Sequence, residues 1–348
     1  MKKRTLGSSS GTMFFVFVMI LAFFSSSLKP AEAQQTKPKK ITLRIVYEQP
    51  ITDRGHSLFK VWQERVNKTA PERLHIQYLG AYEVIPTFEQ MDALRRGTVD
   101  MAVVAPTFYT GVFPDAMAIQ CLGSVATVPE VRKRGMIDLM DKMHRAKLGV
   151  AFLGALWSGD HHVVLLKKPA PKGDITGMKI RAIPVQQPAV RVMGGAVTVI
   201  PPEETYTALQ TGLLDGSASP SMLIPDYKYG EVTEYILYPL IPMSSWVPLL
   251  VRAEVWDGLP EDVKKMILDP LLEMEPQVHP FFANLENEII DDLLRKGLKK
   301  TGALSEAEAT PITKKMREAQ WKAFVEDRAD PAWLPQLNAI GKPLLGLD

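Results

Sequence analysis

Strand-like segments alternate with helix-like segments along most of the chain, and this alternation limits its possible folds more than any other feature. Residues 41–47 alternate between apolar and polar side chains, as a half-buried strand does, and residues 55–67 carry apolar side chains at helical spacing. Strand patterns return at 74–79 and 101–105, with a helix predicted over 87–96. That helix is expected to pack through three apolar side chains: Phe88, Met91 and Leu94. The alternation predicts an α/β fold with a mainly parallel sheet covered by helices.

The same alternation continues through the second half of the chain. Strands are predicted over residues 149–156, 163–166, 178–182 and 197–200. Helices are predicted over residues 187–193, 202–211 and 311–325. Residues 261–300 predict one or two long helices, interrupted near three prolines: Pro270, Pro276 and Pro280. Residues 329–348 are predicted to form a proline-rich tail.

The chain has 348 residues, which exceeds what one hydrophobic core usually supports. It shows no internal repeat and no obvious linker, so we expect two lobes built from interleaved segments. The first lobe is expected to contain residues 41–156 and 247–286. The second is expected to contain residues 157–246 and 287–348.

The N-terminus has the pattern of a cleaved secretory signal. A basic start at residues 2–4 precedes the apolar run 13–24, and a small-x-small site follows at 31–33. The run is shorter than the roughly 20 residues that a membrane-spanning helix needs, so an uncleaved anchor is the weaker alternative. We expect residues 1–33 to be a signal peptide, residues 34–40 to be a tether, and the protein to be exported to the periplasm.

Charge and cysteine content exclude two classes of function. Residues 1–33 carry four basic residues and one acidic residue, so their removal takes the formal net charge from +2 to about −1. A nucleic-acid-binding protein needs a concentrated basic patch, which this balance does not favour. The single cysteine, Cys121, lies among apolar residues and is expected to be buried and inert, with no basic partner to lower its pKa.

Ligands of such sheets bind beyond the carboxyl ends of the strands. The segments to consider are therefore 48–52, 82–86 and 106–109, which follow the first strands. Within them Glu48, Thr107 and Phe108 are candidate ligand contacts. For Glu48 two alternatives stay open, because its carboxylate can bind a ligand hydroxyl or cap a helix.

Several collinear motifs resemble those of the extracytoplasmic solute-binding subunits of tripartite ATP-independent periplasmic (TRAP) transporters, the DctP-type family. The similarity extends over essentially the whole mature chain, in order and at familiar spacing. The motifs are GAYE (80–83) with EQMDALRRGTVDMAVV (89–104), ITGMKIR (175–181), EETYTALQTGLLDG (203–216) closed by Ser219-Pro220, and WDGLPED (256–262).

The resemblance implies both a fold and an activity. The fold is a two-lobed α/β periplasmic binding protein with mixed sheets, a hinge and a long helix spanning both lobes. The activity is capture of a small organic acid in the cleft and its delivery to a membrane permease driven by an ion gradient. Such proteins are not enzymes, and no cofactor is expected.

Arg181 carries the main prediction about the site. In the family, the arginine at the end of this strand pairs with the ligand carboxylate. The chemistry supports the role, since a guanidinium offers a planar fork of donors that matches a carboxylate. The alternative is an arginine that pairs with a structural aspartate.

The sequence departs from the family pattern at two positions. Many members carry a second arginine where His161 stands here, and an asparagine where Ser219 stands. Both changes weaken the polar grip on a dianionic, hydroxylated substrate. The hypothesis is therefore a monocarboxylate, or an apolar or aromatic acid, in contact with four aromatic side chains: Trp157, Trp246, Phe108 and Tyr109.

Two of these candidates have alternatives of their own. Trp157 can instead be ordinary core. His161 is expected to hydrogen-bond the ligand, whereas His162 should point the other way on an extended segment. The adjacent histidines lack the spacing and the further ligands of a metal site, so no metal is predicted.

Two other classes of function are alternatives. An exported hydrolase has no support, since the chain lacks a Gly-x-Ser-x-Gly elbow, a His-Glu-x-x-His motif and a phosphate-binding glycine loop. A binding protein of an ABC importer or a sensor remains as the alternative to a TRAP subunit.

Overall fold

The computed structural model describes residues 39–347 except 49–51, 53 and 201. The predicted signal peptide and most of the predicted tether lie outside the described residues. Residues 40–348 form one compact unit. Within it the strands form two separate sheets, so the predicted α/β class is confirmed.

The first sheet has five strands in the order β2–β1–β3–β10–β4. In that order they span Leu74–Gly80, Ile41–Tyr47, Met101–Val103, Val247–Arg252 and Val150–Trp157. β1 runs parallel to β2 and β3, whereas β10 runs antiparallel to β3 and β4. The three strands from which the parallel sheet was predicted, β1, β2 and β3, are parallel. The antiparallel strand β10 makes the sheet mixed, as the resemblance implies.

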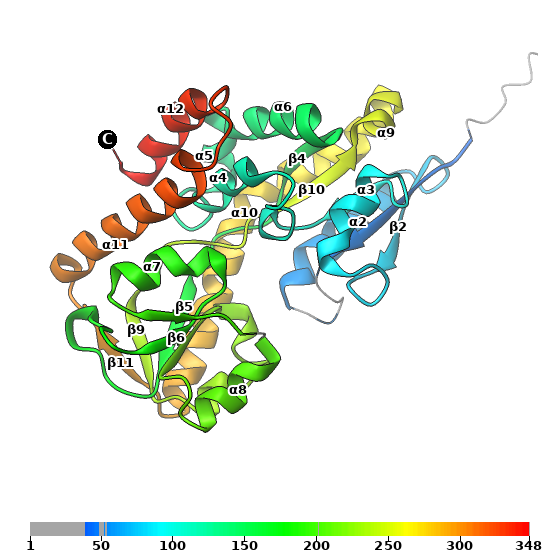
Figure 1. The fold of residues 1–348 in the computed structure, drawn as a ribbon. Helices are drawn as coiled ribbons and strands as arrows, with labels where there is room; N and C mark the ends of the chain where they lie inside the picture. Colours follow the sequence, from blue (N-terminus) through cyan, green and yellow to red (C-terminus); the bar gives the residue numbers. More distant parts are fainter. Residues whose placement is uncertain (1–38, 49–51, 53, 201, 348) are drawn as a thin grey trace, which may run out of the picture. The chain divides into compact units, whose positions relative to one another are not determined.

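The second sheet has six strands in the order β11–β9–β5–β8–β6–β7. In that order they span Lys299–Gly302, Tyr235–Ile241, His162–Leu166, Gly216–Pro220, Lys179–Arg181 and Ala196–Thr198. β5 is antiparallel to β8 and β9, while β6 is parallel to β7 and β8. Figure 1 shows helices α7 (Gln187–Val192) and α8 (Pro202–Gln210) on this sheet.

The remaining helices surround the two sheets. They are α2 (Ser57–Thr69), α3 (Gln90–Arg95), α4 (Met117–Gln120), α5 (Val128–Lys133), α6 (Met136–Leu148), α9 (Ala253–Gly258), α10 (Glu261–Arg295), α11 (Glu306–Trp321) and α12 (Leu334–Leu345). Within the part of the chain that the structure describes, none is long and apolar enough to cross a membrane.

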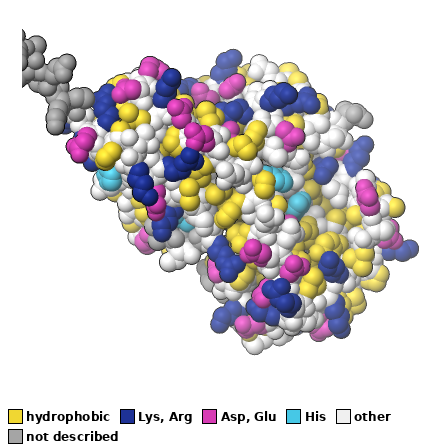
Figure 2. Space-filling view, turned by 180° about the vertical axis from the view of Figure 1, so that it is seen from behind, with side chains coloured by type: hydrophobic (Ala, Val, Ile, Leu, Met, Phe, Trp, Pro, Cys, Tyr) yellow, Lys and Arg dark blue, Asp and Glu magenta, His cyan; other side chains and the backbone are white. Residues whose placement is uncertain are grey.

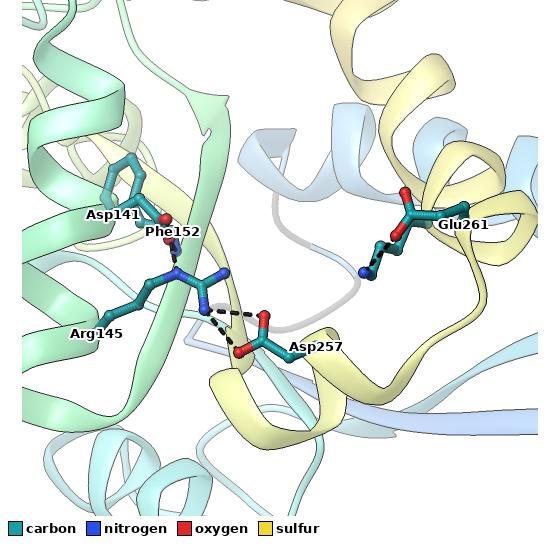
Figure 3. Close-up of polar contacts among 6 residues, drawn as sticks. Asp141, Arg145, Phe152, Asp257 and Glu261 are labelled. Atoms are coloured by element: carbon teal, nitrogen blue, oxygen red, sulfur yellow. Dashed lines mark hydrogen bonds and ion pairs between the residues drawn. The ribbon is translucent and has the colours of Figure 1, made fainter.

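Polar side chains fasten the helices to the first sheet. Asp141 on α6 accepts a hydrogen bond from the backbone N–H of Phe152 on β4 at 2.8 Å, and from Nε of Arg145 at 2.7 Å. Arg145 also donates to both carboxylate oxygens of Asp257 on α9, at 3.0 and 3.1 Å. Figure 3 shows these contacts together with Glu261, which pairs with Lys264 in the first turn of α10 at 2.7 Å.

The longest helix, α10, runs without a break through Pro270, Pro276 and Pro280, so the predicted interruptions are wrong. A proline inside a helix removes one backbone hydrogen bond and strains the preceding turn. Buried side chains along the whole helix, among them Ile267 and Phe282, offset this cost. The helix contacts α2, α5 and β4 on the side of the first sheet and the 3₁₀ turn Ser221–Leu223 after β8 of the second.

Three further expectations are corrected. Residues 299–302 form strand β11 and not the end of a helix, because the helix ends before Gly297, whose φ is 104°. Phe88 is 74% exposed, since residues 87–89 form a 3₁₀ turn that breaks the helical spacing. The supposed C-terminal tail contains helix α12.

Helix α12 begins and ends at residues that favour helix termini. Pro335 lies in its first turn, where a missing N–H costs nothing, and Gly346 closes it with a φ of 66°. The helix packs against α6. The predicted lobe boundaries remain a prediction. They place α12 in the second lobe, although it contacts α6, which they place in the first.

Candidate functional site

Two short segments and helix α10 connect the two sheets. Residues 158–161 join β4 to β5, and residues 242–246 join β9 to β10. We call these two stretches the crossing segments. Three of the predicted site residues lie on or beside them: Trp157, His161 and Trp246.

Arg181 is the last residue of β6, at the carboxyl end of a strand that is parallel to both neighbours. The residue is only 2% exposed. Its Nε donates to the carbonyl of Ile200 and its Nη1 to the carbonyl of Ala218, both at 3.2 Å. These two bonds fix the plane of the guanidinium at the strand end, as a site for a planar anion requires.

His162 lies close enough to Arg181 for the two positive charges to repel each other. Burial, followed by repulsion from His161 and Arg181, lowers the pKa of His162 to about 3, so the ring is neutral at neutral pH. Gln186 accepts from the N–H of Ile183 and donates to Nδ1 of His162, each at 3.1 Å. The ring proton therefore lies on Nε2, a buried donor with no hydrogen-bond partner in the described part of the chain.

Two serine residues at alternate positions of β8 add polar groups on the same side as Arg181, and Ser221 follows in the turn after the strand. Ser217 is the strand partner of Arg181, and Ser219 pairs with Val163. The hydroxyl oxygens of Ser217 and Ser221 are buried and, among the described residues, have no hydrogen-bond partner. A buried polar group without a partner costs free energy, so such a cluster is typical of a place that receives a polar ligand or water.

Sequence reasoning missed this cluster apart from Arg181 and Ser219. The signal was present, since Ser217, Ser219 and Ser221 follow the two-residue period of a strand. The His161 side chain is 33% exposed and contacts Glu286, whereas His162 is buried and contacts Gln186. That the two point in opposite directions stays a prediction. His162 pairs with Pro220 of β8, so its side chain leaves the opposite face of the sheet from Ser217 and Ser219, although it is close enough to Arg181 for their charges to interact.

Glu48, Thr107 and Phe108 follow two parallel strands of the first sheet. Glu48 is 4% exposed, and its carboxylate accepts a hydrogen bond from the N–H of Ala105. Phe108 meets the exposed ring of Phe88 edge-on, with centroids 5.3 Å apart. Thr107 and Phe108 line a surface cavity of about 310 Å³ with Phe88.

The residues at the crossing segments are tightly packed. Trp157 is 2% exposed, and its Nε1 donates to Asp160 at 3.1 Å. His161 contacts Glu286 of α10 through its backbone N–H and through Nδ1, at 3.1 Å for the ring nitrogen. Trp246 is fully buried, and its Nε1 has no hydrogen-bond partner in the described chain.

These contacts divide the eight predicted residues into three groups. The first sheet holds Glu48, Thr107 and Phe108, the crossing segments hold Trp157, His161 and Trp246, and the second sheet holds Arg181 and Ser219. None of the contacts given above joins Arg181 to the first-sheet group. Of the four aromatic side chains expected to provide flat surfaces, only Phe108 is not buried; the fourth, Tyr109, is buried and hydrogen-bonds His144 at 3.0 Å.

Two further observations bear on chemistry. In the described residues, no group of three or more histidine, cysteine, aspartate or glutamate side chains is placed to hold a metal ion. Cys121 is buried, and burial raises the pKa of its thiol to about 12, so it is no nucleophile. Charged side chains of both signs are interspersed over the face shown in Figure 2, without a large patch of one sign.

Comparison with known proteins gives a consistent result. The family described as bacterial extracellular solute-binding protein, family 7 (DctP), matches residues 46–327. The 2,3-diketo-L-gulonate-binding periplasmic protein YiaO of Escherichia coli is 22% identical over 82% of this chain and 85% of its own length.

Solved structures share the fold at low sequence identity. A TRAP periplasmic solute-binding protein from Rhodobacter sphaeroides superposes with a TM-score of 0.74 at 20% identity, over 87% of this chain and 99% of that one. One from Desulfovibrio salexigens with bound orotic acid gives a TM-score of 0.71 at 18% identity, over 88% and 99% of the two chains. The family match covers most of the sequence, and the two-lobed fold agrees with it. The chain therefore belongs to the DctP family of extracellular solute-binding proteins, the binding subunits of TRAP transporters.

Proposed function

We propose that this protein captures a small organic acid in the periplasm, binds its carboxylate through Arg181, and delivers it to the membrane permease of a TRAP system. The observation that carries the proposal is the environment of Arg181. Backbone carbonyls orient the guanidinium at the end of β6. Buried donors of His162 on β5, Ser217 on β8 and Ser221 in the turn after β8 have no hydrogen-bond partner among the described residues. A carboxylate can accept hydrogen bonds from such donors and from the guanidinium.

The relatives support an organic acid as the class of ligand. The protein from Desulfovibrio salexigens holds orotic acid, and YiaO is named for a keto acid of a sugar. In this chain His162 is neutral, so Arg181 is the cation that the second-sheet group offers to a ligand. One positive charge matches one carboxylate, which favours a monocarboxylate, including an aromatic one, over a small dicarboxylate.

The ligand class can be tested by a thermal-shift screen of the purified protein. The panel contains benzoate, pyruvate and orotate as monoanions, and malonate and succinate as dianions. The proposal expects monocarboxylates to raise the melting temperature, because binding to the folded state alone stabilises it. A rise with the dicarboxylates alone would reject this ligand class.

The role of Arg181 is tested by calorimetry with the acid that gives the largest shift. Arg181→Ala should weaken binding by about 2–5 kcal/mol, the range for removing one side of a buried charge pair. Arg181→Lys keeps the charge and loses the fork, so it should restore only part of the affinity. Arg191→Ala on α7 is the control, because this arginine is exposed and hydrogen-bonds Gln187 of the same helix at 2.9 Å. Equal affinity of Arg181→Ala and the control would remove Arg181 from the site.

Delivery to a permease rests on family membership. Co-purification of the closed, ligand-bound protein with the two membrane subunits, and ligand uptake by vesicles that contain them, would test it. Uptake that depends on ATP and not on an ion gradient would favour the ABC alternative.

A further inference from the structure

A buried carboxyl group lies where the two sheets are connected. Asp160 belongs to the first crossing segment and is fully buried. Its Oδ1 accepts hydrogen bonds from the hydroxyl of Ser244 at 2.7 Å and from Nε1 of Trp157 at 3.1 Å. Since Ser244 belongs to the second crossing segment, Asp160 holds the two segments together.

The second oxygen of this carboxyl group is unusual. Oδ2 of Asp160 is buried and has no hydrogen-bond partner within the described residues. A buried carboxylate normally accepts several hydrogen bonds or pairs with a cation. When Asp160 is ionised in this arrangement, one of its two charged oxygens therefore receives no hydrogen bond from the described residues.

Helix α10 closes over the same place. A Cβ atom on Gly159 would lie 2.6 Å from the backbone carbonyl oxygen of His279, so only glycine allows this approach. Ser244 also accepts a hydrogen bond from the N–H of Gly159 at 3.0 Å, and Ser158 donates to the carbonyl of Gly123 at 2.9 Å. Helix α10 and the second crossing segment therefore pack closely against the residue next to Asp160.

Two titratable side chains act on Asp160, and a third, His279, lies against the neighbouring Gly159. Glu286 of α10 is buried and repels a charge on Asp160, whereas His161 of the same crossing segment attracts it. His279 of α10 is half-buried, and burial lowers its pKa, so it is neutral near pH 7. The second crossing segment and the loop 121–126, which carries Gly123, contain no charged residue.

We propose that Asp160 is a proton-operated switch in the connection between the sheets. Protonated Asp160 holds the crossing segments in the arrangement described here, and its ionisation releases them. The orphaned Oδ2 supplies the driving force, because a carboxylate gains water or another partner only when the segments separate. Since both segments connect the sheets, their release loosens one sheet relative to the other.

The direction of the pH dependence follows from the environment. Burial, together with the nearby Glu286, raises the pKa of Asp160 to about 6, against the lowering effect of its hydrogen bonds to Ser244 and Trp157. A raised pKa means that protonation stabilises this arrangement. The arrangement of the two crossing segments is therefore expected to be stable below about pH 6 and to open above it.

The switch is tested on ligand-free protein, so that its failure is separate from any failure of the Arg181 proposal. The resonance of the Trp157 indole N–H, identified by its loss in Trp157→Phe, reports on its own acceptor, Asp160. Over pH 5 to 7.5 this resonance should titrate with a midpoint near pH 6, and small-angle scattering should show a larger radius of gyration at the upper end.

Three variants make the test specific. Asp160→Asn carries no titrating group and should abolish the transition. Ser244→Ala removes a hydrogen bond that favours the carboxylate and should move the midpoint to higher pH. Glu286→Gln removes a repelling charge and should move it to lower pH, each shift being up to about one pH unit. If Asp160→Asn does not fold, the opposite shifts of the other two variants still carry the test.

Two results would overturn the proposal. One is a Trp157 resonance that does not titrate in the unmodified protein. The same holds if the resonance titrates equally in Asp160→Asn, or if its midpoint does not shift in Ser244→Ala and Glu286→Gln. The other is a radius of gyration that stays constant while the resonance titrates, which would make Asp160 a buried titrating group without a conformational role.

Discussion

The indole ring of Trp157 stacks on the phenyl ring of Phe282, with centroids 4.8 Å apart and an angle of 3° between the planes. Trp157 is the last residue of β4, and Phe282 lies in the C-terminal half of α10. The indole also lies against Gly55, where a Cβ atom would lie 2.3 Å from the ring. One side chain therefore joins the first sheet, the long helix and the segment before α2.

Truncation of this side chain should be costly. Trp157→Ala is expected to lower the free energy of unfolding by about 3–5 kcal/mol, since it empties a large buried volume. Trp157→Phe is the matched comparison, because it keeps a ring over Phe282 and loses the hydrogen bond to Asp160, for about 1–2 kcal/mol. Urea unfolding measures both, and equal losses would show that stacking adds little.

Glu275 and Glu273 on α10 allow a comparison of a buried ion pair with an exposed one. Glu275 is 3% exposed and contacts Arg132, with Nε and Oε2 2.8 Å apart. Glu273 is 61% exposed and pairs with Arg65 on α2. Glu275→Gln should cost about 3 kcal/mol, because it leaves a partly buried guanidinium without its charge partner. Glu273→Gln should cost less than about 1 kcal/mol.

Salt provides the control for this pair of variants. The small effect of Glu273→Gln should shrink further in concentrated sodium chloride, because exposed charges are screened. The larger effect of Glu275→Gln should persist. Similar losses for the two variants at low salt would contradict the argument from burial.

The first sheet was predictable because its strands have clear local patterns. Residues 41–47 and 74–79 alternate or form short apolar runs bounded by turns, and both ranges agree with β1 and β2 within one residue. By contrast β11 has the sequence KKTG, which no pattern identifies as a strand. It pairs in parallel with β9, so contacts distant in sequence decide its conformation.

The prolines of α10 show the same limit. Helix propensities predict that Pro270, Pro276 and Pro280 interrupt a helix. A propensity gives the free-energy cost of proline in a helix but not the packing of buried side chains that offsets it. In the site, the position of Arg181 at a strand end was predictable from its motif. The unpartnered Nε2 of His162 was not, because it depends on Gln186, which the fold brings beside it.

Acid should destabilise the protein partly through His144. This residue is fully buried, and burial lowers its pKa to about 4, although its hydrogen bond to the carbonyl of Met140 opposes the shift. The unfolded chain binds the proton near the usual pKa of 6.5, so stability is lost as the pH falls from about 6.5 to 4. The loss amounts to up to about 3 kcal/mol.

His144→Gln removes this contribution, so the variant should lose less stability than the unmodified protein between pH 6.5 and 4. The test compares the curves of unfolding free energy against pH for the two proteins. Their difference isolates His144, because the raised pKa of Asp160 makes acid stabilising and affects both proteins equally. Tyr109→Phe, which removes the phenol that contacts His144, serves as a control that keeps the titrating group. Parallel curves for the unmodified protein and His144→Gln would contradict the prediction.

Helix α12 depends on a glycine for its contact with α11. A Cβ atom on Gly341 would lie 2.1 Å from the indole ring of Trp321, which also donates to Asn338 at 2.8 Å. Gly341→Ala should therefore push the helix away and lower the free energy of unfolding by about 1–3 kcal/mol, the usual cost of overpacking. Gly258→Ala is the matched control, because it lies at the end of α9 with no atom near its Cβ position, and alanine favours a helix. Limited proteolysis between residues 326 and 334 should accelerate in the first variant alone, and equal rates in the two would show that α12 adjusts to a methyl group without leaving Trp321.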